Sequence, residues 1–316
     1  MGGYILKRIV SLIMVLFVVA VVDFIIIHLT PGDPAAVILG SHASEDELAR
    51  LREQLGLNLP ITLQFAKWIS GVLQGDLGWS IFMNMPVTQA IYEHMGPTLS
   101  LTIFAEVIAV VFAIPLGVMA ANRRGSWIDQ GLMILALLGI SLPSFLIGLN
   151  LILLLAVQMN WLPAAGYQPL SSGIFNHLKY LILPAISLGI MQGALIARMT
   201  RSSMLEVMNE NYIRTAEAKG LKTRIVLYKH AFRNAFIPIL TVIGLSFATL
   251  IGGAVVIETV FNIPGIGKLI VNSVLRRDYQ VIQGAVLMIA TSYVLINLVV
   301  DLLYAYIDPR VKYEKS

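Results

Sequence analysis

Six long apolar stretches constrain this chain more than any other feature of its sequence. A helix needs about 20 residues to cross the hydrocarbon core of a bilayer, and the apolar stretches cover residues 9–29, 98–121, 131–157, 178–198, 236–260 and 282–307. Of the 316 residues, 57% are hydrophobic and only 13% are charged, whereas soluble domains are about a quarter charged. The sequence therefore predicts an all-α membrane protein with six transmembrane helices.

The first stretch has an alternative reading as a signal peptide, because Lys7 and Arg8 precede the apolar run. A signal peptide has an apolar region of about 7–15 residues that ends at small residues. This run is longer, and no small-x-small site follows it closely. We interpret it as an uncleaved membrane anchor.

The distribution of basic residues predicts the orientation in the membrane. Cytoplasmic loops are enriched in Lys and Arg. With the N-terminus inside, the larger share of the 22 Lys and Arg residues falls on the inner side, including a dense run from Arg198 to Arg233. We therefore expect both termini to be cytoplasmic, which agrees with an even number of spans.

These features divide the chain into four parts: a tail with the first helix (1–29), an outer loop (30–97), a five-helix core (98–307) and a C-terminal tail (308–316). The outer loop contains Ser44 followed by three acidic residues, which is typical of a helix start. We expect this loop to form a small folded cap, and contact with an extracytoplasmic partner is compatible with that fold.

The inner loop, residues 199–235, has a definite internal order. Residues 212–219 contain no helix breaker, and Gly220 stands where a helix C-cap is expected. Tyr212, Ala216 and Gly220 share one side of that helix, and a second short helix is expected over 222–234. The segment is either a docking element for another protein or an amphipathic helix on anionic lipid, and its chemistry alone does not separate the two.

Several motifs resemble one family of membrane proteins. TAEAKGL at 215–221 and HAFRNAFIP at 230–238 look like the cytoplasmic coupling loop of bacterial ABC-importer permeases, most closely the dipeptide/oligopeptide/nickel/glutathione group. Further matches along the chain, in the family's order, are LTPGDP (29–34), QLGL (54–57), GDLG (75–78), RMTRSSM (198–204), PGIG (264–267), RDY (277–279) and DPR (308–310). The Glu-Ala-Ala triplet of the wider importer family is replaced by Arg214-Thr215-Ala216, so the role of its acidic residue does not transfer, and Glu217 is not a substitute for it.

The resemblance implies a type I ABC-importer permease bundle in the bacterial inner membrane. Two such permeases would pair, two ATPase subunits would dock on the inner loops, and an extracytoplasmic protein would deliver di- or oligopeptides, with nickel chelates or glutathione as alternative cargo. The ATPase-coupling residues would be Tyr212, Ile213, Arg214, Thr215, Ala216, Ala218, Lys219, Gly220 and Leu221. The residues facing the binding protein would be Pro31, Gly32, Asp33, Pro34, Gly75, Asp76 and Gly78.

Polar residues inside the predicted spans could line a translocation path or could form hydrogen bonds between helices. The candidates are Ser141, Ser187, Gln192, Ser246 and Thr249. The same two readings apply to the acidic residues within spans, such as Glu106, and the sequence leaves both open.

Enzymatic functions find little support. GIGKL at 265–269 lacks the spacing of a phosphate-binding loop, because Asn262 and Leu269 stand where Gly and Ser/Thr are required. The five histidines are scattered and the chain has no cysteine, so no metal site is predicted. We expect ATP and Mg²⁺ to bind a partner subunit and this chain to bind no cofactor of its own. A secondary carrier that works alone would need an ion-coupling site and recognisable repeats, and a non-transporting scaffold would use the inner loop only to bind lipid.

Overall fold

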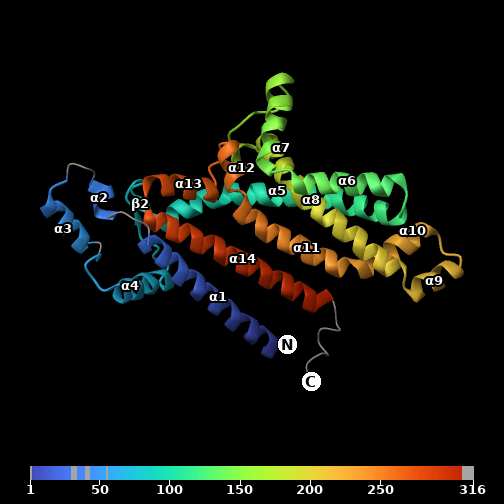
Figure 1. Cartoon of the computed structure of the whole chain (residues 1–316), viewed down its shortest axis with the longest axis horizontal. Coiled ribbons are helices and arrows are strands. Elements are labelled where there is room, and N and C mark those ends of the chain that lie inside the picture. Colours follow the sequence, from blue (N-terminus) through green and yellow to red (C-terminus); the bar gives the residue numbers. More distant parts are fainter. Residues whose placement is uncertain (1, 30–33, 40–42, 55, 308–316) are drawn as a thin grey trace. The chain divides into compact units, whose positions relative to one another are not determined.

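The computed structural model describes residues 2–29, 34–39, 43–54 and 56–307, and almost all of its regular structure is helical (Figure 1). The described residues form two compact units. The first unit comprises Met1–Gly96 with Pro264–Val294, and the second comprises Pro97–Ile263 with Leu295–Ser316. Each unit therefore combines segments that are distant in the sequence.

The first unit contains the predicted outer loop. Its elements are α1 (Gly2–Leu29), α2 (Pro34–Leu39), α3 (Glu45–Gln54), α4 (Ile61–Leu73), the two-residue antiparallel strands β1 (Trp79–Ser80) and β2 (Met85–Pro86), α13 (Ile266–Arg276), and the first parts of α5 (Val87–Asn122) and α14 (Tyr279–Ile307). Rings from α1 and α4 pack edge to face, with the centroids of Phe24 and Phe65 5.2 Å apart. A second apolar cluster joins α5, α13 and α14 through Val87, Leu269 and Val281. Of the short helices in the predicted outer loop, α4 therefore packs on the longer helix α1.

The second unit contains the core of the bundle. Its elements are the rest of α5 and α14, α6 (Trp127–Ser141), α7 (Ser144–Leu151), the π-helical segment η1 (Ile152–Gln158), the 3₁₀ turn η2 (Leu170–Ser172), α8 (Ile174–Met208), α9 (Asn211–Ala218), α10 (Thr223–Ile225), the π-helical segment η3 (Val226–Ala231), α11 (Phe232–Gly253) and α12 (Val255–Val260). Two apolar clusters fill it, one around Leu181 and Phe261 and one around Met204 and Ile213.

Four helical segments in the described residues are long and apolar enough to cross a membrane: Val87–Asn122, Ile174–Met208, Thr223–Gly253 and Tyr279–Leu303. A bent pair, Trp127–Ser141 with Ser144–Gln158, makes up to five if it counts as one span. The apolar part of α1, Val10–Ile26, is shorter than these. The protein is an all-α membrane protein, while the predicted number of six spans goes beyond the four or five that length and composition support.

Two predicted spans are not single helices. The stretch 131–157 was expected to be continuous, but α6 and α7 meet at an angle of 99° (Figure 1). Leu142 has an extended backbone, with ψ 128°, and precedes Pro143. The proline ring disfavours the helical region for the residue before it. The stretch 236–260 is divided into α11 and α12 after Gly252 and Gly253, residues with low helix propensity.

Candidate functional site

Helix α9 ends in a complete Schellman motif. The N–H of Gly220 donates to the carbonyl of Glu217 at 2.8 Å, and the N–H of Leu221 donates to the carbonyl of Ala216 at 3.4 Å. Gly220 has φ +76°, and no atom lies within 4 Å of where its Cβ would be. Glycine is therefore favoured here by the left-handed backbone and not by lack of space. The predicted helix and its C-terminal glycine are both confirmed.

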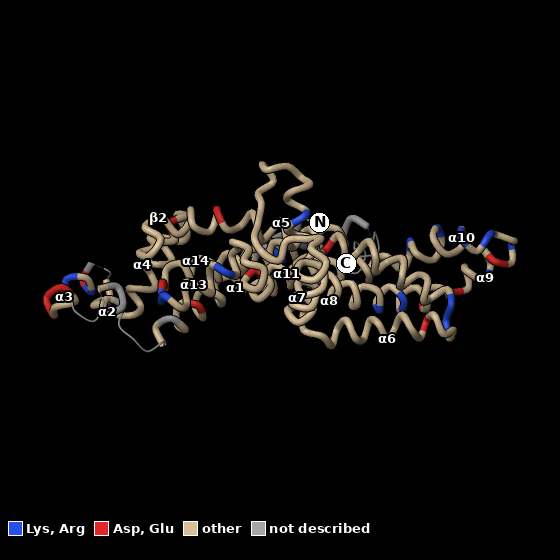
Figure 2. Tube along the Cα trace, turned by 90° about the horizontal axis from the view of Figure 1, so that it is seen from above, with Lys and Arg blue, Asp and Glu red and all other residues tan. Residues whose placement is uncertain are grey.

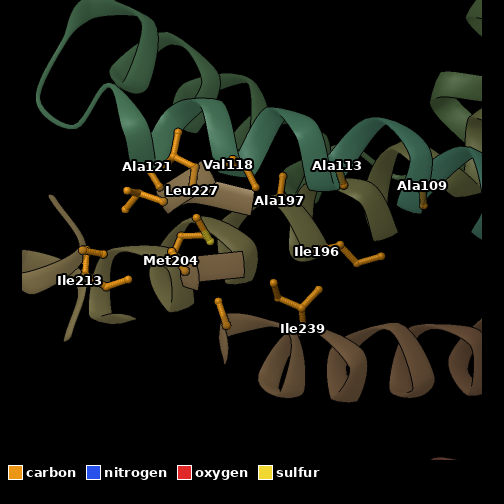
Figure 3. Packing of buried hydrophobic residues seen from close by; sticks show 14 residues of the cluster. Ala109, Ala113, Val118, Ala121, Ile196, Ala197, Met204, Ile213, Leu227 and Ile239 are labelled. Carbon is orange, nitrogen blue, oxygen red and sulfur yellow. The ribbon is translucent and has the colours of Figure 1, made fainter. Parts of the chain in front are cut away.

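One face of α9 belongs to the interior of the second unit. Ile213 and Ala216, three residues apart, are buried in an apolar cluster with Met204 of α8 and Leu227 of η3. Figure 3 shows the labelled residues of this cluster, which come from α5, α8, α9, η3 and α11. Tyr212, Ala216 and Gly220 were predicted to share one side of this helix, but Ala216 is buried while the other two are exposed. Residues at i and i+3 share a helix face, so Ala216 lies on the same inward face as Ile213.

The opposite face of α9 is open to solvent. Its exposed residues are Asn211, Tyr212, Arg214, Thr215, Glu217, Ala218 and Lys219, followed by Gly220 and Leu221. Lys and Arg positions gather around α9 and α10 (Figure 2). We call these exposed residues the α9 surface. It carries basic and acidic side chains together with the small side chains of Thr215 and Ala218.

Tyr212 ties the start of α9 to the next helix. Its hydroxyl accepts a hydrogen bond from Asn234 Nδ2 at 2.8 Å, and the same Nδ2 donates to the carbonyl of His230 at 3.1 Å. The predicted separate helix over 222–234 was wrong: α10, η3 and α11 form one uninterrupted helical segment from Thr223 to Gly253. A movement of α9 would therefore act directly on a span.

An ion pair lies on α8, the helix that leads into α9. The guanidinium of Arg201 on α8 donates to both carboxylate oxygens of Asp129 on α6, at 2.5 Å from Nε to Oδ1 and 2.7 Å from Nη2 to Oδ2. Asp129 Oδ2 also accepts from the N–H of Gly125, and the N–H of Asp129 donates to Ser126 Oγ. Neither residue of this pair stands out in the sequence. Ser126 and Asp129 have the spacing of a capping box, but nothing in the sequence indicates the partner 72 residues further on.

The candidate path residues mostly connect helices. Gln192 Nε2 of α8 donates to Thr249 Oγ1 of α11 at 3.0 Å, and Ser246 Oγ of α11 donates to Glu106 Oε1 of α5 at 2.5 Å. Thr249 Oγ1 donates to the carbonyl of Ser246 at 2.8 Å and so connects the two pairs. The structure thus brings Gln192, Ser246 and Thr249 into one polar chain with Glu106.

The other two candidates bond within their own helices. The hydroxyl of buried Ser187 donates to the carbonyl of Leu183, and that of exposed Ser141 donates to the carbonyl of Leu137, both at 2.8 Å. Neither joins the polar chain described above.

The candidates for contact with a binding protein lie in the first unit. Gly75 and Gly78 have positive φ, and Asp76 Oδ1 accepts the N–H of Gly78 at 2.9 Å, which closes a tight turn before β1. A Cβ at Gly78 would lie 2.8 Å from Gln280 Oε1, the acceptor of the Trp79 N–H. Pro34 begins α2, while Pro31, Gly32 and Asp33 lie outside the described residues.

A small cavity of about 130 Å³ opens in the same unit, beside the turn that joins β1 to β2. It is lined by Phe82, Met83, His94, Leu269, Asn272, Ser273, Arg276 and Asp278. Asp278 is held by Ser80, whose hydroxyl donates to Oδ2 at 2.6 Å. Across the described ranges, no three His, Cys, Asp or Glu side chains are placed to hold a metal ion.

Comparison with known proteins gives consistent results along the whole chain. Residues 113–313 match the family described as the inner membrane component of binding-protein-dependent transport systems, and residues 1–102 match the N-terminal part of that component. A probable peptide ABC transporter permease of Sinorhizobium fredii is 48% identical over 99% of this chain and 100% of its own length.

Two further relatives carry more specific names. A dipeptide transport system permease of Alkalihalophilus pseudofirmus is 44% identical, and a glutathione transport system permease of Salmonella paratyphi A is 45% identical. In both cases the match covers 99% of this chain and 100% of the relative.

Proposed function

Because the chain belongs to the family of inner membrane components of binding-protein-dependent transport systems, we propose that it forms the translocation pathway for di- or oligopeptides and is driven by separate ATPase subunits that dock on α9. It is a multi-pass permease subunit of a peptide-family ABC importer in the bacterial inner membrane. Such importers work with ATPase and binding-protein partners in general. The cargo, the docking site and the make-up of the complex are the proposal.

The architecture of α9 is the observation that carries the docking assignment. A docking helix must present an exposed surface and still transmit force, which requires firm packing on its other side. Ile213 and Ala216 fix one face of α9 in the core of the unit, while Arg214, Glu217 and Lys219 are exposed. A helix that binds lipid would instead turn its apolar residues outward, and on α9 the buried Ile213 turns inward.

The proposed cycle follows from how α9 is connected. ATP and Mg²⁺ bind the partner ATPases, whose closure displaces α9 as a rigid element. Since α8 enters α9 and the span containing α11 follows it, the displacement would alternate the bundle between outward-open and inward-open states. This scheme places α9 and both termini in the cytoplasm. A second permease subunit would complete the pathway.

Peptides are the leading cargo because relatives of similar identity are named as peptide and dipeptide permeases. Glutathione, itself a short peptide, is the second candidate, and one relative at 45% identity supports it. An extracytoplasmic binding protein would select the cargo and would face the side of the first unit that carries the turn with Gly75, Asp76 and Gly78.

Affinity purification from native membranes tests the proposed function. The tagged chain, extracted in mild detergent, should bring down an ATP-binding subunit and a second permease, identified by mass spectrometry. Right-side-out vesicles supplied with the binding protein should then take up labelled dipeptide only when ATP is inside. A chain that purifies alone, in vesicles that take up peptide under an ion gradient without ATP, would refute the proposal in favour of a secondary carrier.

A further inference from the structure

We propose that the Asp129–Arg201 ion pair is a permanent strut that makes α6 move together with α8 and α9, so that both residues position α6 for coupling. The inference rests on the proposed function, because it concerns how a displacement of α9 spreads through the bundle. It assigns a role to two residues that lie outside the α9 surface and outside the polar chain.

The geometry of the pair is that of a fixed connection. The guanidinium of Arg201 and the carboxylate of Asp129 form two parallel hydrogen bonds, which fix orientation as well as distance. The Asp129 side chain is 3% exposed and that of Arg201 is 27% exposed. Breaking such a pair leaves a buried charge without its partner, which is strongly unfavourable. The pair therefore stays formed while the helices move.

The carboxylate is itself held in place from its own helix. Asp129 lies in the first turn of α6, where Ser126 is the N-cap, and Gly125 donates its N–H to Oδ2 at 2.9 Å. Through these hydrogen bonds Arg201 is connected to the backbone at the beginning of α6, and not only to the Asp129 side chain. A displacement of Arg201 is thus transmitted to the backbone of α6.

Close packing along α8 completes the rigid body. A Cβ at Gly117 of α5 would lie 2.6 Å from the carbonyl of Ala197, and one at Gly139 of α6 would lie 3.2 Å from the Cβ of Ala194. Met204, one turn beyond Arg201, packs in the cluster that holds Ile213 of α9. The cytoplasmic half of α8 is thereby connected to α5, to α6 at two levels, and to α9.

The strut explains how α6 can follow α9. Helix α6 is joined to α5 by the short turn 123–126 and is separated from α7 by the 99° bend, so its position beside α8 depends on the contacts that it makes with α8. Apolar surfaces can slide over one another, whereas a bidentate ion pair has one geometry. The pair therefore holds α6 in one position relative to α8. Apolar residues in its place would not specify that position.

The test measures peptide taken up per ATP hydrolysed in the assembled importer. Asp129→Asn and Arg201→Gln should each lower this ratio by about 2- to 30-fold, the range seen when positions outside the binding sites alter coupling. The double variant should be no worse than either single one, because the two residues act as a unit. Arg198→Ala, which removes an exposed charge one turn earlier on α8, should leave the ratio unchanged.

A cross-link separates the strut from a general loss of stability. The chain has no cysteine, so Asp129→Cys with Arg201→Cys gives the subunit its only two thiols. A short bifunctional maleimide should restore the uptake ratio of this variant, while the monofunctional N-ethylmaleimide should not. Unchanged ratios in the single variants, or a cross-link that blocks uptake or fails to restore it, would overturn the strut.

The outcomes also separate this inference from the proposed function. If the ATPase does not co-purify with the unmodified chain, the proposed function fails first. If it co-purifies with every variant and the uptake ratio stays at the unmodified level, only the strut fails.

Discussion

Ser246 Oγ donates a hydrogen bond to Glu106 Oε1 at 2.5 Å, and this contact joins α11 to α5 inside the second unit. Both residues are buried, and within the described residues Glu106 Oε2 has no hydrogen-bond partner. Since Thr249 bonds to Ser246 and Gln192 bonds to Thr249, three spans share one polar chain. These hydrogen bonds connect α5, α8 and α11 to one another.

Ser246→Ala should destabilise the protein. It removes the donor from a buried carboxyl oxygen, which costs roughly 1–3 kcal/mol, and should lower the midpoint of thermal unfolding of the detergent-solubilised protein. Ser141→Ala is the matched control, because Ser141 is exposed and bonds only to its own helix. If Ser246 served only the cargo path, the variant would lose uptake at an unchanged unfolding midpoint.

Ala216→Leu should lower the stability of the protein, whereas Ala218→Leu should weaken its association with the ATPase. Ala216 is buried against the core cluster, so a larger side chain overpacks it at a cost of about 1–3 kcal/mol and lowers the unfolding midpoint. Ala218 is exposed on the α9 surface, so its replacement should leave the midpoint unchanged and weaken association with the ATPase. Equal effects of both variants on stability would show that α9 packs differently.

Substitutions at Gly220 separate backbone strain from surface contact. An L-residue in the left-handed region costs about 1–2 kcal/mol, less for Asn, and there is open space around the missing Cβ. Uptake per ATP should therefore fall least in Gly220→Asn, more in Gly220→Ala and most in Gly220→Trp. The additional loss in Gly220→Trp would report contact with a partner. Normal uptake by Gly220→Trp would refute the docking role of this end of α9.

The start of α3 should depend on pH. Ser44 and Glu47 form a reciprocal capping box, in which the N–H and hydroxyl of Ser44 donate to Glu47 Oε2, both at 2.9 Å. The Ser44 N–H and hydroxyl lower the pKa of Glu47 from its ordinary value of 4.5. A lowered folded-state pKa means that this stabilisation is complete above pH 4.5 and is lost as the pH falls through the folded-state value.

Amide hydrogen exchange in residues 45–54, corrected for intrinsic rates, checks this pH dependence. Protection should fall below pH 4.5 in the native chain. It should vary little in Glu47→Gln, because glutamine can form the same box without titrating. Equal pH dependence in both proteins would contradict the assignment.

Local signals in the sequence predicted local structure well. The Ser44 helix start, the helix over 212–219 and the terminating glycine at 220 are all confirmed, because caps and left-handed residues act within a few positions. The helix start is visible in the bonds between Ser44 and Glu47, and the glycine in the positive φ of Gly220. Membrane class and family also followed from apolar length and motif order.

What the sequence did not predict depends on contacts between distant segments or on competing local effects. Ala216 was assigned to an open face because its small size was considered without Ile213, whose burial decides which way α9 turns. The helix ends before Pro143 in a stretch whose hydropathy is continuous, whereas Pro97, Pro115, Pro184 and Pro238 lie inside helices. The Asp129–Arg201 pair arises from packing of α6 on α8, and charge patterning along one chain contains no signal for it.

Site-specific cross-linking shows directly whether an ATPase docks on the α9 surface. A photoreactive amino acid at Ala218, exposed on α9, is compared with one at Ala216, buried on the opposite face of the same helix. Irradiation of the native complex should join the Ala218 probe to an ATP-binding subunit, while the Ala216 probe should cross-link only within the chain. Cross-linking of the Ala218 probe to lipid alone would refute docking of the ATPase on the α9 surface.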